Sequence, residues 1–293
     1  MTAMIQARGL SRHYGRLKAL DGIDLDIPAG RIVGLIGPNG AGKTTALKAI
    51  LGLSSFRGEL SVLGMNPAKE RDRLMREVCF IADVAVLPRW ARVRQIIELT
   101  EGLHPRFSRK RCLHYLQATK IRPDARIRAL SKGMVVQLHL ALVMAIEARL
   151  LVLDEPTLGL DILFRKRFYS NLLNEYFDED RTILVTTHQV EEIEHILTDL
   201  IFIKEGRLVL NSTMDDIQQR YTELMVKPDQ VEAARALEPI HERVLFGRHI
   251  FLFDRPNTAQ LDLLGELHRP SIADLFVALM GESESSADLE SAA

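Results

Sequence analysis

The stretch GPNGAGKTT, from Gly37 to Thr45, decides the fold of this chain. It matches the pattern G-x-x-x-x-G-K-[ST] in full, after an apolar run, RIVGLIG, typical of a buried strand and before the helical pattern GKTTALKAILG. In this context, glycines allow backbone N–H groups to close around phosphate oxygens, whereas a glycine-rich turn without a ligand is the alternative. We expect Lys43 to reach the β- and γ-phosphates of a nucleotide and the Thr44 hydroxyl to ligate Mg²⁺. The predicted nucleotide-binding residues of this loop are Gly37, Pro38, Asn39, Gly40, Ala41, Gly42, Lys43, Thr44 and Thr45.

Strand and helix patterns alternate on both sides of this loop. RGELSVLG, EVCFIAD, RLLVLDEP and RTILVTT are typical of strands, FRKRFYSNLLNEYF is typical of a helix, and DLIFIKEGRLVLNS predicts a hairpin that turns at Glu205 and Gly206. Such alternation predicts an α/β fold with a mostly parallel sheet covered on both faces.

A second motif, LLVLDEP, runs from Leu150 to Pro156 and places two carboxylates at the end of a buried strand. Carboxylates beside a core are costly unless a cation meets them. We therefore predict that Asp154 holds Mg²⁺ through its water shell and that Glu155 is the general base for an attacking water. Two acidic residues that merely begin a loop are the alternative, which the phosphate-binding loop in the same chain disfavours.

Composition, charge and apolar runs limit the classes of protein to which this chain can belong. The chain has 293 residues, of which 47% are hydrophobic, and a net charge of −1, so no global field indicates nucleic acid or membrane. The start MTAMIQARGL lacks the apolar core of a signal peptide, and every apolar run is interrupted before the length of about 18 residues that a membrane span needs. Cys79 and Cys112 form no metal or disulfide pattern, as expected for reduced thiols in a cytosolic protein.

The stretch RALSKGMVVQ, from Arg128 to Gln137, predicts a helix that begins after Ser131 as its N-cap. A helix start of this kind offers unpaired N–H groups to an anion. Three motifs follow one another along the chain: LSKGM at Leu130 to Met134, LGLD ending at Asp161, and TTHQVEE with His188 at the end of a strand. With the phosphate-binding loop, this order resembles the nucleotide-binding subunits of ATP-binding cassette (ABC) transporters, from about Ile5 to Tyr221.

The resemblance implies the fold and the roles of single residues. It implies a P-loop ABC ATPase fold: a mostly parallel core sheet, an antiparallel β subdomain and an inserted helical subdomain. Ser131 and the backbone of Gly133 would bind the γ-phosphate held by the opposite subunit of a dimer. Tyr14 would stack on adenine, unless it is a surface tyrosine in a hairpin. His188 would contact the γ-phosphate and orient water, and Asp161 would link the two active sites.

The chain departs from the family pattern at three positions. In the signature motif LSKGM, Lys132 and Met134 replace glycine and glutamine, and this form resembles the branch that pairs with ABC-2-type export permeases. Lys132 adds positive charge near phosphate, so we expect it to preserve binding. Asp83 stands where the family has the Q-loop glutamine; a carboxylate reaches Mg²⁺ but donates no hydrogen bond as an amide does. Because Glu155 and His188 are both present, we expect a symmetric homodimer.

Patterns along the chain predict an ABC ATPase domain over residues 1–220, with the helical subdomain at about 92–148, and an α+β accessory domain over 221–281. In the accessory domain, YTELMVK, ERVLFG and HIFLFD are typical of strands, and PDQVEAARALE, NTAQLDLLGEL and SIADLFVALM of helices. PSIADLFVALMGE resembles the closing helix of ABC-2-type exporter ATPases. We expect this domain to stabilise the dimer rather than to regulate turnover. The acidic tail, 282–293, is expected to be disordered.

From His104 to Gly133, nine Lys or Arg residues stand against one acidic residue, Asp124. Such a run is either a solvated face or a surface for anionic lipid headgroups or a polar partner.

The resemblance implies an ATP-hydrolysing, Mg²⁺-dependent subunit that drives a separate ABC-2-type permease for export of a drug, antibiotic, lipid or polysaccharide. The alternatives are a soluble ABC ATPase acting on ribosomes or DNA, and the ATPase of an importer. Expected partners are a second copy of the chain and an integral membrane permease, which selects the cargo. We expect a peripheral protein on the cytoplasmic face of the inner membrane and no nucleic acid partner.

Overall fold

The computed structural model describes residues 3–82, 87–187 and 190–281. Two compact units make up the chain: one combines Met1–His188 with Ile203–Leu208, and the other combines Gln189–Phe202 with Val209–Ala293. Within the described residues, no helix has the length and apolar character needed to cross a membrane.

The first unit is built on the predicted parallel sheet. Its strands follow the order β5-β6-β7-β3, and the sheet continues with β8 and β9, the predicted hairpin. The residues of β3, β6 and β7 are all buried, which explains why each strand is a continuous apolar run instead of an alternating pattern. The strand bounds are Ile32–Ile36 for β3, Val78–Ile81 for β5, Leu150–Asp154 for β6, Thr182–Thr186 for β7, Asp199–Lys204 for β8 and Arg207–Thr213 for β9.

An antiparallel sheet and a helix flank the loop that follows β3. The antiparallel sheet has the order β2-β1-β4, with β1 at Ala3–Tyr14, β2 at Leu17–Pro28 and β4 at Arg57–Val62. The helix α1, Lys43–Ile50, packs against β2 and β4 through buried residues that include Leu47 and Ile50. This antiparallel sheet and the parallel sheet together form the mixed arrangement that the family resemblance implies.

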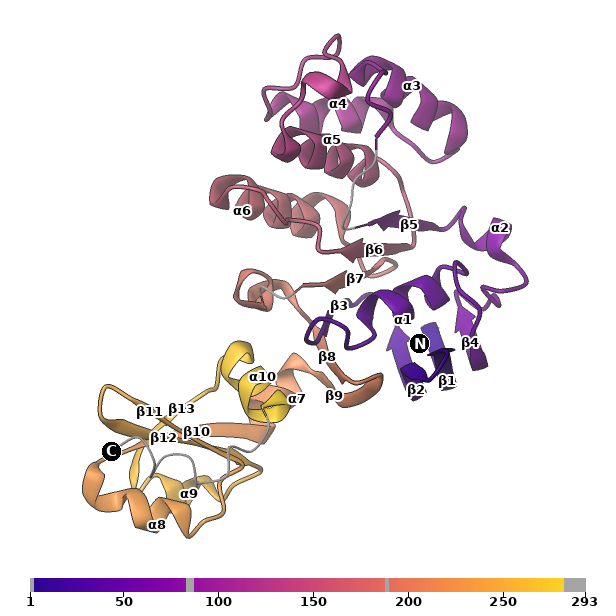
Figure 1. The fold of residues 1–293 in the computed structure, drawn as a ribbon. Helices are drawn as coiled ribbons and strands as arrows, with labels where there is room; N and C mark the ends of the chain where they lie inside the picture. Colours follow the sequence, from indigo (N-terminus) through magenta and orange to yellow (C-terminus); the bar gives the residue numbers. More distant parts are fainter. Residues whose placement is uncertain (1–2, 83–86, 188–189, 282–293) are drawn as a thin grey trace. The chain divides into compact units, whose positions relative to one another are not determined.

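Three helices form a separate cluster between β5 and β6 (Figure 1): α3 at Val93–Leu103, α4 at Arg109–Gln117 and α5 at Lys132–Met144. This cluster is the predicted helical subdomain. Cys112 lies in its core and Cys79 lies on β5; both thiols are unpaired, and burial raises the pKa of each to about 12. A buried thiol with a raised pKa forms little of the reactive thiolate at neutral pH.

The second unit contains an antiparallel sheet of order β11-β12-β10-β13. Its core is apolar and includes Leu224, Phe251 and Phe253 from the strands and Val231 and Ala234 from a helix. The bounds are Met214–Arg220 for α7, Tyr221–Val226 for β10, Val231–Arg235 for α8, His241–Leu245 for β11, Arg248–Asp254 for β12, Thr258–Leu261 for α9, Gly265–His268 for β13 and Ile272–Met280 for α10.

The prediction of one helix over NTAQLDLLGEL was wrong. Helix α9 ends at Leu261, and β13 begins at Gly265 and pairs with β10. A Cβ at position 265 would lie 2.1 Å from the Met225 carbonyl oxygen, so glycine permits the close approach of the two strands. Leu267 then lies opposite Leu224 and packs on the apolar core, a long-range contact that outweighs the local helical pattern.

Candidate nucleotide site

The phosphate-binding loop runs from the end of β3 to the start of α1. Two of its glycines are required by close packing. A Cβ at Gly37 would lie 2.3 Å from the Ile203 carbonyl oxygen, and one at Gly42 would lie 2.4 Å from the Ala19 carbonyl oxygen. Gly42 also has a φ of 111°, which side chains rarely adopt. The loop is thereby held against neighbouring strands, and its backbone N–H groups are available where α1 begins without a side-chain cap.

Lys43 is the only charged residue of this loop, and it is buried with 8% of its surface exposed. Its Nζ donates to the Gly37 carbonyl at 2.6 Å and to the Pro38 carbonyl at 3.2 Å. Burial lowers the pKa of Lys43, while the charges of Glu155 and Asp154 act in the opposite direction. The ammonium thus lies inside the loop, where a phosphate would replace carbonyl oxygens as its partner.

The two carboxylates of LLVLDEP lie at the end of β6. Asp154 has 6% of its surface exposed and accepts a hydrogen bond from the Thr186 hydroxyl, on the neighbouring strand β7. The Glu155 N–H donates to the Thr186 carbonyl at 3.1 Å. Glu155 has a φ of 48°, a left-handed conformation uncommon for residues other than glycine and concentrated at functional sites. Both carboxylates lie near Lys43, since the charges of Glu155 and Asp154 each act on its ammonium.

Thr186 is a functional candidate that the sequence did not reveal. Its side chain orients Asp154 and its backbone holds Glu155, so one residue positions both carboxylates. The stretch RTILVTT places Thr186 at the end of a strand. The partner of its hydroxyl, however, follows only from the pairing of β6 with β7.

The signature motif begins α5 as predicted. The Ser131 hydroxyl accepts from the Met134 N–H at 3.2 Å, which confirms the N-cap, and Ser131 and Lys132 are both exposed. The helix start also lies beside the LGLD loop, because a Cβ on Gly133 would contact the Gly159 carbonyl oxygen at 3.6 Å. Asp161 caps α6 by accepting from Phe164 N–H at 2.9 Å.

The start of α6, Ile162–Asn171, carries apolar side chains in an unusual setting. Ile162 has 68% of its surface exposed and Leu163 has 80%, and the neighbouring Leu158 is exposed as well. These residues flank Asp161, next to the signature motif. The signature motif and the LGLD loop therefore form one surface with both polar donors and apolar area.

Tyr14 ends β1 opposite Leu17 of β2, so its position in a hairpin is confirmed. The ring has 46% of its surface exposed, and the Arg12 guanidinium lies 4.7 Å from the ring centroid. Hydrogen bonds from Ser54 and from Arg12 lower the pKa of Tyr14. No local pattern predicts these two neighbours, which lie beside an exposed aromatic ring.

Two predicted site residues, Asp83 and His188, lie outside the described residues. Their predicted roles remain predictions. The described chain leads up to them at β5, which ends at Ile81, and at β7, which ends at Thr186.

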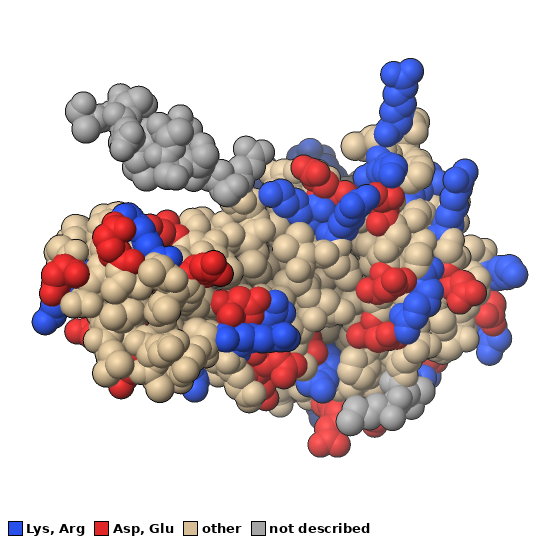
Figure 2. All heavy atoms as spheres, turned by 90° about the horizontal axis from the view of Figure 1, so that it is seen from below, with Lys and Arg blue, Asp and Glu red and all other residues tan. Residues whose placement is uncertain are grey.

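The basic run of the helical subdomain is partly neutralised within the fold. Its first arginines form ion pairs, among them Arg106 with Glu77 at 2.6 Å and Arg111 with Glu147 at 3.1 Å. Later members remain exposed, namely Lys120, Arg122, Arg126, Arg128 and Lys132. On a different face of the molecule, seen from below in Figure 2, Lys and Arg side chains are interleaved with Asp and Glu side chains. The positive charge that this run offers to a partner is therefore smaller than its count of basic residues suggests.

The packing of the loop leads to a prediction for two glycines. Gly37→Ala is expected to reduce the free energy of unfolding by about 1–3 kcal/mol, because the new methyl group must displace the Ile203 carbonyl. The same change is expected to weaken ATP binding. Gly40→Ala meets open space and adds only the left-handed penalty of about 1–2 kcal/mol at its φ of 81°. Urea denaturation and ATP titration of both variants test this; a larger loss of affinity in Gly40→Ala would contradict it.

Comparison with known proteins agrees with this geometry. A family model described as "ABC transporter" matches residues 20–158. Nod factor export ATP-binding protein I of Cupriavidus metallidurans is 32% identical over 96% of this chain and 98% of its own length. The protein of the same name from Ralstonia nicotianae is 30% identical over 96% of this chain and 94% of its own length.

Solved structures show the same fold. A structure described as the ATP-binding subunit of an ABC transporter has a TM-score of 0.67 and 26% identity, covering 73% of this chain and 92% of that one. A bacterial Atm1-family ABC exporter with ATP bound has a TM-score of 0.64 at 19% identity, covering 73% of this chain and 39% of that one. The glycine cradle around Lys43, the carboxylates at the end of β6 and the capped signature helix agree with these matches, and the chain belongs to the ATP-binding, ATP-hydrolysing subunits of the ABC transporter family.

Proposed function

We propose that this chain hydrolyses ATP to drive export through a separate membrane permease of the ABC-2 type. The observation that carries the proposal is the extent of the likeness: it covers 96% of the chain, so it includes most of the second unit, and the relatives are export ATP-binding proteins by name. The LSKGM form of the signature motif supports the same branch. The cargo would be selected by the permease. The domain boundaries 1–220 and 221–281 are part of the proposal.

The nucleotide would be held by residues of the first unit. Lys43 would bind the β- and γ-phosphates, replacing its loop carbonyls, and Tyr14 would stack on adenine with its exposed face. The Thr44 hydroxyl and Asp154, with Asp83 as a further ligand, would hold Mg²⁺, and a buried carboxylate beside a phosphate loop fits a hard cation. When bound, Mg²⁺ supplies positive charge that offsets the charge of the phosphate oxygens.

Hydrolysis would need a base beside the γ-phosphate. Glu155 would accept a proton from the attacking water as the water oxygen bonds to the γ-phosphorus and the bond to the ADP oxygen breaks. The Glu155 backbone has a left-handed conformation, and the Thr186 hydroxyl would keep Asp154 in place for the metal. His188 would orient the water and contact the γ-phosphate.

Two copies of the chain would complete each site. The Ser131 hydroxyl oxygen accepts from the Met134 N–H as the cap, and its O–H would donate to the γ-phosphate on the opposite copy, together with the Gly133 N–H. Asp161 would lie between the two sites, and exposed Ile162 and Leu163 would become buried between the copies. This arrangement gives a symmetric homodimer with two hydrolysing sites.

The helical subdomain offers a surface for the permease. Trp90 has 75% of its surface exposed, and Leu99 and Leu103 of α3 are also exposed. Aromatic side chains of this kind are common anchors in protein interfaces. Contact of this surface with a membrane-embedded partner would place the chain at the cytoplasmic face of the inner membrane as a peripheral protein.

Co-purification tests the proposed partner. The chain, expressed with an ABC-2-type permease, is expected to co-purify with it from detergent and to show permease-stimulated ATP hydrolysis. Trp90→Ala is expected to reduce co-purification without changing ATP affinity, whereas Phe246→Ala, at a fully exposed position of the second unit, serves as the control. Tight, salt-sensitive binding to DNA or RNA without permease binding would instead favour the soluble ABC ATPase.

A further inference from the structure

Two short segments of the helical subdomain lie side by side although they are distant in the sequence. Residues 89–94 lead into α3, and residues 122–128 follow α4 and precede the signature motif. Arg92 and Arg126 are opposite each other in an antiparallel bridge. Backbone hydrogen bonds of 2.9–3.1 Å also join the segments, with donor N–H groups on Val93, Arg94, Ile127 and Arg128.

Arginines dominate the exposed part of both segments. The apolar members Ala91, Val93 and Ile127 are buried, with at most 3% of their surface exposed, and hold the segments to the subdomain. The arginines stay at the surface, where Arg92 is half-buried and the others are exposed. These six residues, named the arginine patch here, are Arg89, Arg92, Arg94, Arg122, Arg126 and Arg128.

Carboxylates neutralise little of the charge of this patch. Asp124 is the only acidic residue of the two segments, and its carboxylate pairs with Arg94 at 3.3 Å. Arg92 donates to the Asp124 carbonyl oxygen at 2.6 Å. Within residues 3–82, 87–187 and 190–281, no carboxylate forms an ion pair with Arg89, Arg122, Arg126 or Arg128.

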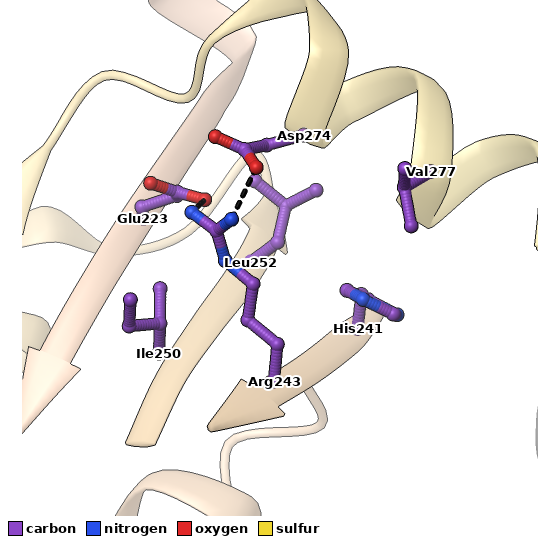
Figure 3. Close-up of a pocket in the computed structure, with 7 residues that line it drawn as sticks. All are labelled: Glu223, His241, Arg243, Ile250, Leu252, Asp274 and Val277. Atoms are coloured by element: carbon purple, nitrogen blue, oxygen red, sulfur yellow. Dashed lines mark hydrogen bonds and ion pairs between the residues drawn. The ribbon is translucent and has the colours of Figure 1, made fainter. Parts of the chain in front are cut away.

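Other arginines of the chain are compensated by the fold. Figure 3 shows Arg243 of β11 extending toward Asp274 of α10 and Glu223 of β10. Its guanidinium donates to Glu223 Oε1 at 3.0 Å and also to Asp274. In the first unit, Arg106 donates to both carboxylate oxygens of Glu77, at 2.6 and 2.8 Å. The arginine patch lacks carboxylates of this kind, so a partner outside the chain would have to supply the negative charge.

The chemistry of the patch matches phosphate groups at a bilayer surface. Like charges directly opposite each other, as at Arg92 and Arg126, destabilise a strand pair, and an anionic partner would offset that cost. A guanidinium binds phosphate oxygens through two parallel N–H donors. Trp90, within the first segment, has 75% of its surface exposed. Tryptophan is enriched where a bilayer meets water, at the level of the headgroups.

We propose that the arginine patch binds the phosphate headgroups of an anionic lipid bilayer. This inference rests on the proposed function for its place beside a membrane, but the contact needs no permease. The fold adds Arg89, Arg92 and Arg94 to the basic run that the sequence displays from His104 to Gly133. A nucleic acid partner is disfavoured by the net charge of −1, because domains that bind nucleic acid are typically strongly basic.

Sedimentation of the full chain with vesicles tests the proposal. Vesicles with equal parts of phosphatidylglycerol and phosphatidylcholine are expected to bind the chain, less so at high salt, and vesicles of phosphatidylcholine alone are not. Arg126→Gln combined with Arg128→Gln is expected to weaken binding roughly 25-fold, since each basic residue near an anionic surface contributes roughly 5-fold. Absence of binding of the unchanged chain to the anionic vesicles would overturn the proposal.

The matched control is Arg71→Gln combined with Arg73→Gln, at exposed positions of α2, Arg71–Leu74. It changes the net charge equally and is expected to bind vesicles as the unchanged chain does. Equal weakening by both double variants, at unchanged melting temperatures, would show that the patch is not a local site. Displacement of the vesicles by duplex DNA would assign the patch to nucleic acid instead. Lost vesicle binding with retained permease co-purification would count against the lipid contact and not against the proposed function.

Discussion

Glu155→Gln is expected to bind Mg-ATP as tightly as the unchanged chain and to lose hydrolysis, with kcat lower by roughly 10²–10⁴-fold. The amide has nearly the same size and keeps the backbone turn at φ 48°, but it does not accept the proton of the attacking water. Lys43 and Asp154 remain in place to hold the nucleotide and the metal. An ATPase assay measures the loss, and size-exclusion chromatography with Mg-ATP is expected to show a stable dimer.

The control for this variant is Glu147→Gln, the same chemical change at an exposed residue of the helical subdomain. Its hydrolysis rate is expected to equal that of the unchanged chain, because the surface ion pair with Arg111 contributes little. Hydrolysis by Glu155→Gln at the rate of the control would exclude Glu155 as the base. Loss of ATP binding in Glu155→Gln would indicate that the carboxylate contributes to nucleotide binding and not to hydrolysis alone.

The second large effect concerns Ser131, which we expect to act on the nucleotide of the other copy. Ser131→Arg adds bulk at the exposed start of α5 and is expected to abolish hydrolysis by preventing two copies from closing. ATP affinity of the isolated chain is expected to remain, since Lys43 and Tyr14 supply it. Lys43→Ala is also expected to abolish hydrolysis, because it removes the buried ammonium from the phosphate-binding loop of its own chain.

Mixing these two inactive variants separates action in trans from action in cis. In a mixed dimer, one site combines the Lys43→Ala loop with the Ser131→Arg helix, and the other site contains neither change. Partial recovery of ATP hydrolysis is therefore expected for the mixture. If verified mixed dimers stay inactive and Ser131→Arg alone has lost ATP affinity, Ser131 acts within its own chain. If the mixed dimers stay inactive but Ser131→Arg alone still binds ATP, both sites of a dimer must be intact for hydrolysis.

Several features follow from the sequence because they depend on contacts between residues close in the chain. The phosphate-binding loop, the N-cap at Ser131 and the hairpin between β8 and β9 are examples. Turn and cap chemistry is determined within about four residues, so the local pattern is sufficient. Buried strands such as β6 are equally visible, since an apolar run that ends in two acidic residues has few other structural explanations.

Other features depend on residues that the fold brings together. The sequence shows that positions 37 and 265 are glycines, but only the tertiary structure shows why a side chain does not fit there. The Ile203 carbonyl occupies that space at Gly37, and the Met225 carbonyl occupies it at Gly265. The basic residues of the run were counted correctly from the sequence. Glu77, which lies 29 residues before Arg106, nevertheless neutralises part of their charge. The Thr186 contact with Asp154 and the Arg92 pairing with Arg126 are of the same kind. Such contacts are set by strand order and helix packing, which bring together distant side chains whose pairing no local pattern encodes.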